Sequence, residues 1–229
     1  MKKLLAIFCV LAVFASTAVA APKKSKVKGS KIGVSMPTKD LQRWNQDGAN
    51  MKAQLEAAGY KVDLQYAAND IPTQVSQIEN MITGKCKVLV IAAIDGSALK
   101  NPLEQAKKKG IKVIAYDRLI MNTDAVSYYA TFDNYKVGTI QGEYLVDKLG
   151  LKTRSSSDPV YMELFTGDPG DNNINFFFGG AMDILNPYIE SGVIVVPSKQ
   201  TSKAQCATLN WSTEEAQKRM ENLITSNGY

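Results

Sequence analysis

The sequence predicts an α/β protein of two Rossmann-like lobes, each a parallel sheet flanked by helices. From residue 31 onward, short β-rich runs alternate with stretches of helical periodicity. Residues 87–93 (KVLVIAA) form a continuous apolar run, which is typical of a parallel strand covered on both faces. A second round of the same alternation begins near Asn134. Strands alternating with helices of this length indicate βαβ units with right-handed crossovers, and so helices on both sides of the sheet.

The helices and strands of the first lobe are predicted from hydrophobic periodicity and from glycines at the ends of helices. Trp44, Gly48, Met51, Leu55 and Ala58 recur at spacings of three and four, which places them on one face of a helix. Glycine follows each predicted helix of this lobe, as is common just past a helix end. We expect strands at 31–36, 61–66, 87–93, 111–115 and 127–131, and helices at 43–58, 71–83 and 99–109.

The second lobe has fewer strand signals. Its last helix begins at the capping sequence Ser212-Thr213-Glu214-Glu215. Because only two clear strands are present, we expect this second lobe to be incomplete. Predicted helices span 137–149, 173–186 and 213–226, the last with Ala216, Met220, Leu223 and Ile224 on its apolar side; predicted strands span 159–165 and 193–196, and 154–158 is a polar loop.

The amino end predicts export. Lys2 and Lys3 precede an apolar run at 4–13, and the segment closes with Ala18-Val19-Ala20-Ala21. These are the parts of a signal peptide, and the run is shorter than the ~20 residues that a membrane span needs. Cys9 lies inside the run, which argues against a lipid anchor. We therefore assign 1–20 to a signal peptide, 21–30 to a flexible basic leader, 31–132 to the first lobe and 133–229 to the second.

Composition excludes several functions. The formal net charge is +5, and two of these charges come from Lys2 and Lys3 of the predicted signal peptide. The net charge that is left is mild, so we expect no nucleic-acid partner. The absence of histidine excludes histidine triads and histidine zinc sites. Cys86 and Cys206 cannot form a metal cluster by themselves. We expect two unpaired, partly buried thiols, although the sequence leaves their pairing open. We expect no metal and no cofactor.

Polar and aromatic residues follow the predicted strands, where ligand sites of such sheets lie. Arg43 and Trp44 follow the first strand, Asp117 and Arg118 follow the fourth, and a loop with Asp171 and Asn173 opens a helix of the second lobe. Arginine and carboxylate groups suit sugar hydroxyls, while an indole suits the apolar C–H face of a sugar.

Each of these features also has a purely structural interpretation. Trp44 beside Arg43 fits a core tryptophan next to a surface arginine, and Asp117 with Arg118 fits a local ion pair. Asp171 and Asn173 also suit a helix cap. Trp211 fits a core position as well as it fits a ligand plate.

Together the motifs resemble those of the type I periplasmic sugar-binding proteins of ABC importers, in the xylose-binding and multiple-sugar-binding branch. The resemblance covers nearly all of residues 31–229. The matching motifs are QRWNQDG (42–48), QVSQIENMI (74–82), VLVIAAIDG (88–96), IKVIAYDRLI (111–120), ATFDNYKVG (130–138), GDPGDNN (167–173) and AQKRMENLI (216–224).

The resemblance implies a non-enzymatic, monomeric periplasmic protein. Its two lobes close around one xylose-, glucose- or galactose-like monosaccharide and deliver it to a membrane permease, with a chemoreceptor as a second partner. By this resemblance Arg43 and Trp44 supply an arginine and an aromatic plate, Asp117 and Arg118 grip ring hydroxyls, and Asp171 and Asn173 add contacts from the second lobe. Phe132, Asp133 and Asn134 resemble the first of three hinge crossings.

The chain departs from this pattern at its carboxyl end. The family's last helix is followed by a strand with an Asn-Asp contact, a Gly-Gln-Asp segment and two further hinge crossings. None of these follows residue 226 here. We therefore expect a truncated chain whose second lobe exposes apolar surface and which binds sugar weakly or not at all.

Two other classes stay open as alternatives. The ligand-binding domain of a sugar-responsive repressor needs a basic helix-turn-helix at its amino end, where this chain has an export signal. An exported carbohydrate-active enzyme needs paired carboxylates in a cleft, and Asp117 and Asp171 are the candidates for that pair.

Overall fold

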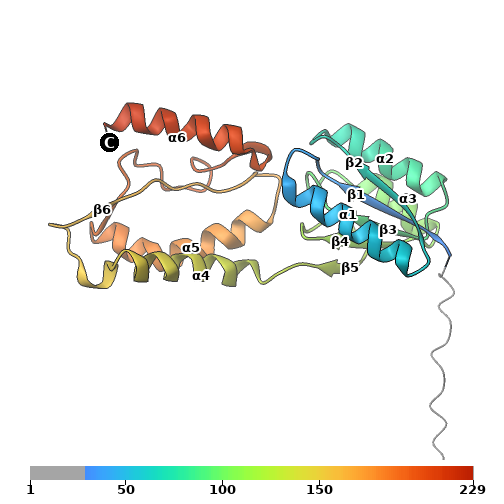
Figure 1. Ribbon diagram of the computed structural model, residues 1–229, viewed down its shortest axis with the longest axis horizontal. Coiled ribbons are helices and arrows are strands. Elements are labelled where there is room, and N and C mark those ends of the chain that lie inside the picture. The colour runs from blue at the N-terminus through green and yellow to red at the C-terminus, as the bar shows by residue number, and fades with distance from the viewer. Residues whose placement is uncertain (1–28, 229) are drawn as a thin grey trace, which may run out of the picture.

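The computed structural model describes residues 29–228, which form two lobes side by side (Figure 1). The predicted signal peptide and residues 21–28 of the predicted leader lie outside the described residues. Gly29 and Ser30 are bonded to the first sheet, because Gly29 N donates to Gly59 O and Lys61 N donates to Ser30 O, each over 3.0 Å.

The first lobe is a five-stranded parallel sheet in the order β2-β1-β3-β4-β5. This confirms the predicted βαβ organisation and the fifth strand. Its elements are β1 (Lys31–Met36), α1 (Gln42–Ala57), β2 (Lys61–Tyr66), α2 (Ile71–Thr83), β3 (Val88–Ile91), α3 (Lys100–Lys108), β4 (Lys112–Tyr116) and β5 (Val126–Ala130).

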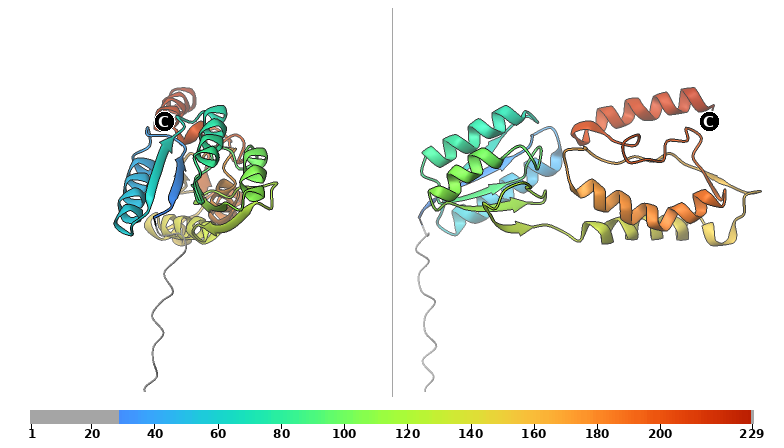
Figure 2. Two further views of the ribbon diagram at one scale, coloured as in Figure 1. Left: turned by 90° about the vertical axis from the view of Figure 1, so that its right-hand side faces the viewer. Right: turned by 180° about the vertical axis from the view of Figure 1, so that it is seen from behind.

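Helices cover both faces of this sheet, with α1 on one side and α2 and α3 on the other (Figure 2). The central strand β3 accordingly divides its side chains between two apolar clusters. Leu89 and Ile91 pack with α2 and α3, whereas Val90 packs with Trp44 of α1. The continuous apolar run of the sequence therefore marks a strand buried on both faces.

The predicted apolar face of the first helix is correct except at its end. Trp44 and Gly48 are buried, and Met51 and Leu55 pack partly buried against the same cluster. Ala58 is exposed. It caps the carboxyl end of α1 and lies beyond the last turn that meets the sheet.

The second lobe consists mainly of helices. α4 packs against α5, and two short strands, β6 and β7, pair in parallel. Its elements are α4 (Asn134–Lys148), a 3-10 turn η1 (Leu151–Thr153), β6 (Val160–Tyr161), α5 (Asn173–Glu190), β7 (Ile194–Val195), a second turn η2 (Leu209–Trp211) and α6 (Thr213–Asn227).

Both predicted strands of this lobe are longer than the observed ones. After β6, Met162 N still donates to Val195 O, but Thr166 N donates to Cys206 O, outside any strand. The extended segment thus leaves its neighbour after a few residues. The helix predicted at 173–186 instead runs through Pro187 to Glu190, although proline removes one main-chain hydrogen bond.

Close packing of α4 on α5 depends on glycines. A Cβ at Gly138 would lie 2.2 Å from Phe177 O, and a Cβ at Gly180 would lie 2.2 Å from Tyr135 O. Only hydrogen fits at these two points, so the backbones of the two helices touch.

α6 is less buried than its sequence predicts. Leu223 is buried, but Met220 and Ile224 of the predicted apolar side are 38% and 45% exposed. The helix meets the lobe along one edge, where Arg219 donates to Leu164 O and covers the Phe165 ring. Ser212 caps the helix as predicted, accepting from Glu215 N over 3.3 Å.

Cys86 and Cys206, the two cysteines within residues 29–228, lie in different lobes and are unpaired, as expected. Both are fully buried rather than partly buried, with exposures of 1% for Cys86 and 0% for Cys206. The prediction underestimated their burial because each thiol belongs to an apolar cluster of its lobe.

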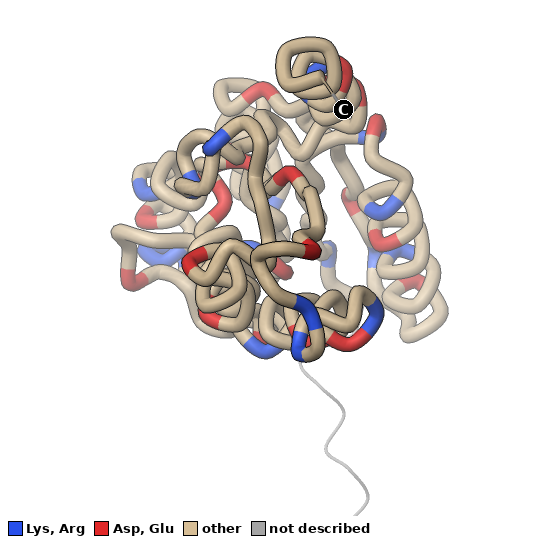
Figure 3. The backbone as a smooth tube through the Cα atoms, turned by 90° about the vertical axis from the view of Figure 1, so that its left-hand side faces the viewer, with Lys and Arg blue, Asp and Glu red and all other residues tan. Residues whose placement is uncertain are grey.

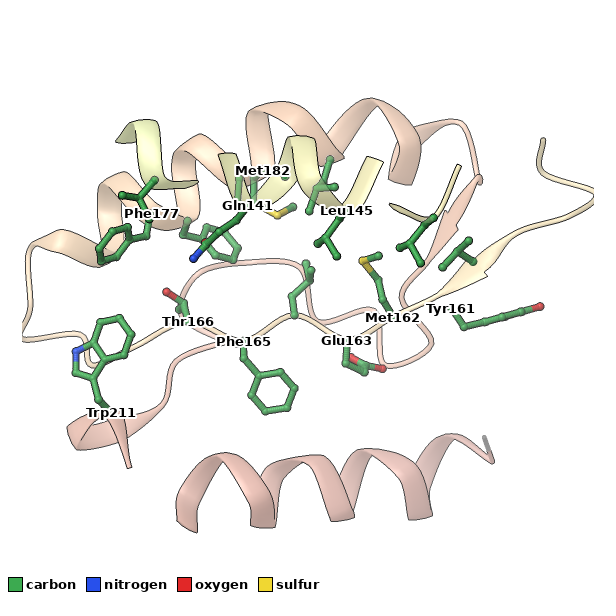
Figure 4. A pocket seen from close by; sticks show the side chains of 18 residues that line it. Gln141, Leu145, Tyr161, Met162, Glu163, Phe165, Thr166, Phe177, Met182 and Trp211 are labelled. Carbon is green, nitrogen blue, oxygen red and sulfur yellow. The ribbon is translucent and has the colours of Figure 1, made fainter. Parts of the chain in front are cut away.

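An apolar groove of about 580 Å³ runs through the second lobe (Figure 4). It lies between the α4–α5 pair and the extended segment that continues β6. Leu145, Met162, Phe177 and Met182 are among the side chains that line it. This groove matches the expectation of uncovered apolar surface in the second lobe.

Basic and acidic positions are interspersed over the end of the molecule shown in Figure 3. Within residues 29–228, no helix has the length and apolar character that a membrane crossing requires.

Candidate ligand-binding site between the lobes

A cavity of about 160 Å³ lies between the lobes, at the carboxyl ends of the first lobe's strands. All six residues predicted for ligand binding line it. The lining residues are Leu41, Arg43, Trp44, Asp117 and Arg118 from the first lobe and Asp171, Asn173, Phe177 and Trp211 from the second. The volume suits one small molecule rather than a polymer, since a water molecule takes about 30 Å³ of liquid.

Arg43 and Asp117 form an ion pair at the cavity wall. Arg43 Nη2 donates to Asp117 Oδ2, and Arg43 Nε also lies 3.4 Å from Asp47 Oδ2. Burial lowers the pKa of Arg43, but the hydrogen bond and charge of Asp117 outweigh it and raise that pKa. Arg43 is therefore held by first-lobe carboxylates while it faces the cavity.

Arg118 and Asp171 form a second ion pair, which joins the two lobes. Arg118 Nε lies 3.2 Å from Asp171 Oδ2, and both side chains are at least nine-tenths buried. Arg118 Nη1 donates to Ala93 O over 3.0 Å. Burial lowers the pKa of Arg118 and raises the pKa of Asp171, and the attraction between them only partly offsets this. The guanidinium stays cationic near neutral pH, because arginine holds its proton even when buried.

Asn173 connects the lobes through its amide. Its Nδ2 donates to Asp117 O over 3.1 Å, and its Oδ1 accepts from Asn134 Nδ2 over 3.0 Å. The N-cap residue of α5 is Asn172, whose side chain makes no cap hydrogen bond, but Asp171 Oδ1 accepts from Asn173 N over 2.9 Å at the start of the helix. This local hydrogen bond and the contacts across the lobes therefore coexist.

Trp44 serves as core residue and cavity wall together. It is 3% exposed and belongs to the cluster under α1. The guanidinium carbons of Arg43 and Arg118 lie 4.6 and 5.2 Å from its ring centroid. Two cations over one indole keep both arginines near the cavity.

Trp211 also lines the cavity. The sequence had left open whether this residue belongs to the core or contacts a ligand. Its Nε1 donates to Asp171 Oδ2 over 3.2 Å. A Cβ at Gly167 would lie 2.1 Å from the indole, so only glycine leaves room for it.

The sequence reasoning missed Leu41 and Phe177. Leu41 is the N-cap residue of α1, next to the Arg43 motif. Phe177 lies one helical turn after Asn173 in α5 and meets Trp211 edge-on, with ring centroids 6.4 Å apart. The four-residue spacing from Asn173 is the signal that could have found it.

The residues predicted as a hinge connect β5 to α4. Phe132 is 62% exposed, Asp133 caps α4 by accepting from Lys136 N over 2.9 Å, and Asn134 is buried. Within residues 29–228 the chain passes from one lobe to the other only here. Among the same residues, no three His, Cys, Asp or Glu side chains form a group that could hold a metal ion.

Two α/β lobes with a polar, tryptophan-lined cavity between them define a bilobal ligand-binding protein. Comparison with protein families agrees: residues 32–229 match the periplasmic binding protein domain. The chain belongs to this family.

Individual relatives are similar over most of the chain. A multiple sugar-binding periplasmic protein of Azospirillum brasilense is 54% identical over 195 residues, covering 85% of this chain and 54% of that protein. A D-xylose-binding periplasmic protein of Escherichia coli is 40% identical over 200 residues, covering 87% of this chain and 56% of that protein.

A solved structure is similar in fold as well. It is an ABC transporter solute-binding protein of Clostridium phytofermentans with bound β-D-glucose, 65% identical and with a TM-score of 0.83. The match covers 86% of this chain and 60% of that one. The chain thus spans little more than half the length of these relatives.

Proposed function

We propose that this protein captures a monosaccharide in the cavity between its lobes and delivers it to the membrane permease of an ABC sugar importer. The observation that carries the proposal is the convergence of Arg43, Trp44, Asp117, Arg118, Asp171 and Asn173 on one small cavity. The names of the relatives support it, since they specify multiple sugars and xylose, and the solved relative holds glucose.

The chemistry of the cavity suits a neutral sugar. Each arginine faces a carboxylate, so the site offers both donors and acceptors while its charges balance. Hydroxyl groups of a sugar both donate and accept, and they can share these groups without adding an unpaired charge. Two indoles, Trp44 and Trp211, offer apolar surface for the ring C–H groups.

Export, a chemoreceptor as a second partner and a monomeric state belong to the same proposal. The two lobes would close over the sugar and exclude water, and the closed form would be the one that the partners recognise. Phe132, Asp133 and Asn134 would act as a hinge crossing.

Tryptophan fluorescence offers a direct test. Both tryptophans of the chain line the cavity, so sugar binding should change the emission. D-glucose, D-xylose and D-galactose are titrated into the millimolar range, so that weak binding is also detected. Arg43→Ala should weaken binding at least tenfold, which corresponds to about 1.4 kcal/mol of binding free energy. A lost hydrogen bond to a charged group accounts for a change of this size.

A matched arginine provides the control. Arg154 forms a surface ion pair with Asp158 in the second lobe and does not line the cavity. Arg154→Ala should bind like the unmodified chain. Equal losses in both variants, or no saturable signal with any sugar, would contradict the proposal, and recovery of a chemically altered sugar would favour the enzyme alternative.

A further inference from the structure

The segment directly after β4 folds into an unusual turn around Asp117. Asp117 has a φ of 62°, and Arg118 N donates to Tyr116 O over 2.7 Å. A bond from residue i+2 to residue i around a positive φ is the arrangement of the classic γ-turn, which is rare and strained. Such strain persists only where the surrounding structure holds it.

This turn separates two neighbouring side chains that the cavity needs. The Asp117 carboxylate meets Arg43, whereas the next side chain, Arg118, meets Asp171 and Ala93 O. A relaxed backbone at Asp117 would redirect the carboxylate, and with it the ion pair at the cavity wall.

Three side-chain donors hold the carbonyl oxygen of Asp117. Thr131 Oγ1 donates over 2.9 Å, Tyr129 Oη over 3.1 Å and Asn173 Nδ2 over 3.1 Å. The amide of Asp117 is also bonded, to Ala130 O over 2.7 Å. Rotation of the Asp117 carbonyl out of the turn would break these side-chain bonds together.

We propose that Tyr129 and Thr131 are positioning residues of the cavity. Neither lines it. They act through the Asp117 carbonyl, by keeping the strained turn that directs the Asp117 carboxylate into the site. Both come from the first lobe, so they hold the turn whether or not Asn173 of the second lobe is in contact. The effect on sugar affinity rests on the proposed function, whereas the effect on the turn does not.

The first test needs no sugar. Tyr129→Phe with Thr131→Val removes both hydroxyls and keeps the ring and the branched shape. A positive φ brings the amide proton and Hα of one residue close, so the Asp117 intraresidue NOE in NMR spectra reports the turn. The NOE should weaken in the double variant and persist in Tyr128→Phe, a neighbouring tyrosine that is 65% exposed. An unchanged NOE in the double variant overturns the proposal.

Restoring one hydroxyl separates positioning from a general loss of stability. Tyr129→Phe with Thr131→Ser keeps a donor at the second position and should recover the NOE. Thermal unfolding of every variant checks that the chain is folded. A double variant that unfolds at the temperature of the unmodified chain but loses the NOE supports the proposal.

The second test uses sugar and monodeoxy sugars. Each monodeoxy sugar is first titrated into the unmodified chain and into Asp117→Ala. The deoxy sugar that binds both chains equally well lacks the hydroxyl that Asp117 holds. The double variant should bind the full sugar about tenfold more weakly than the unmodified chain, which corresponds to about 1.4 kcal/mol of binding free energy. It should bind that deoxy sugar as tightly as the unmodified chain does. Equal losses for both sugars would overturn the positioning role. If the unmodified chain binds no sugar, the proposed function fails while the NOE still decides the role of Tyr129 and Thr131.

Discussion

Asn173 of the second lobe donates a hydrogen bond to the main-chain oxygen of Asp117 in the first lobe, over 3.1 Å. The same amide nitrogen lies 3.4 Å from Asp117 Oδ1. This side chain therefore ties a helix start in one lobe to a strand end in the other. Its Oδ1 accepts from Asn134, beside the segment that connects the lobes. The Asn173 amide thus links the lobes beside the Arg118–Asp171 ion pair, with its donor facing the first lobe.

Asn173→Asp should loosen the contact between the lobes. The change keeps the shape of the side chain but replaces the donor with an oxygen that faces the Asp117 carbonyl and carboxylate. Loss of a buried donor costs about 1–3 kcal/mol, and like charges add to it. Small-angle X-ray scattering should show a larger radius of gyration. Asn175→Asp, at an exposed position of the same helix, should leave it unchanged; a compact Asn173→Asp variant would refute the link.

Adjacent glycines of α5 should respond in opposite directions to alanine. A Cβ at Gly180 meets Tyr135 O at 2.2 Å, whereas nothing lies within 4 Å of a Cβ at Gly179. Gly180→Ala should destabilise the second lobe by about 1–3 kcal/mol because α4 must move. Gly179→Ala should stabilise it by about 0.5–1 kcal/mol through helix propensity. Urea unfolding measures both, and a stable Gly180→Ala variant would contradict the observed packing.

The Lys31–Asp63 pair should give a pH-dependent contribution to stability. Their charged atoms lie 2.6 Å apart. Burial raises the pKa of Asp63, but the hydrogen bonds from Lys31 and Gln65 and the charge of Lys31 outweigh it, so this pKa is lowered from its ordinary value of 3.8. A lowered carboxyl pKa contributes stability that is fully present above the unfolded pKa and is lost as pH falls through the folded one.

Asp63→Asn should therefore lower the free energy of unfolding by about 0.2–1 kcal/mol at neutral pH, with the difference fading below pH ~4. Denaturant titrations at several pH values measure this difference. Asp124, in a more exposed pair with Lys107, is the comparison position. A penalty for Asp63→Asn that grows toward acid would show that the sign is wrong.

The apolar groove of the second lobe should bind a hydrophobic dye. Such dyes fluoresce on exposed apolar surface, and the groove presents Leu145 and Met182 (Figure 4). Leu145→Lys should reduce the fluorescence by placing a charge there. Ile140→Lys, which changes an exposed residue of α4 outside the groove, should have little effect. Equal dye fluorescence in the two lysine variants would place the dye elsewhere.

Local patterns predicted most of the elements of the first lobe. The periodicity around Trp44 and the apolar run before Ala93 depend on neighbours a few residues away, and such patterns are legible in a sequence. The second lobe was harder, because the length of β6 depends on how far β7 follows it. The exposure of Ile224 likewise depends on whether another element covers α6.

The candidate site was predicted as a set of residues but not as a geometry. Rules about strand ends selected Arg43, Asp117 and Asn173, and the resemblance to a family added their roles. Neither indicated that Trp44 lies under two guanidinium groups or that Trp211 donates to Asp171. Those contacts arise only after the lobes have met.

The class of fold, the order of the elements and the residues that follow the strands could be predicted from the sequence, because these depend on short-range periodicity and on residue chemistry. The contact of Asn173 with Asp117, 56 residues away, could not be predicted in this way. The same is true of the positive φ of Asp117, whose carbonyl accepts hydrogen bonds from Tyr129 and Thr131. The physical reason is that a strained backbone needs partners from other elements, and packing alone brings those partners into place.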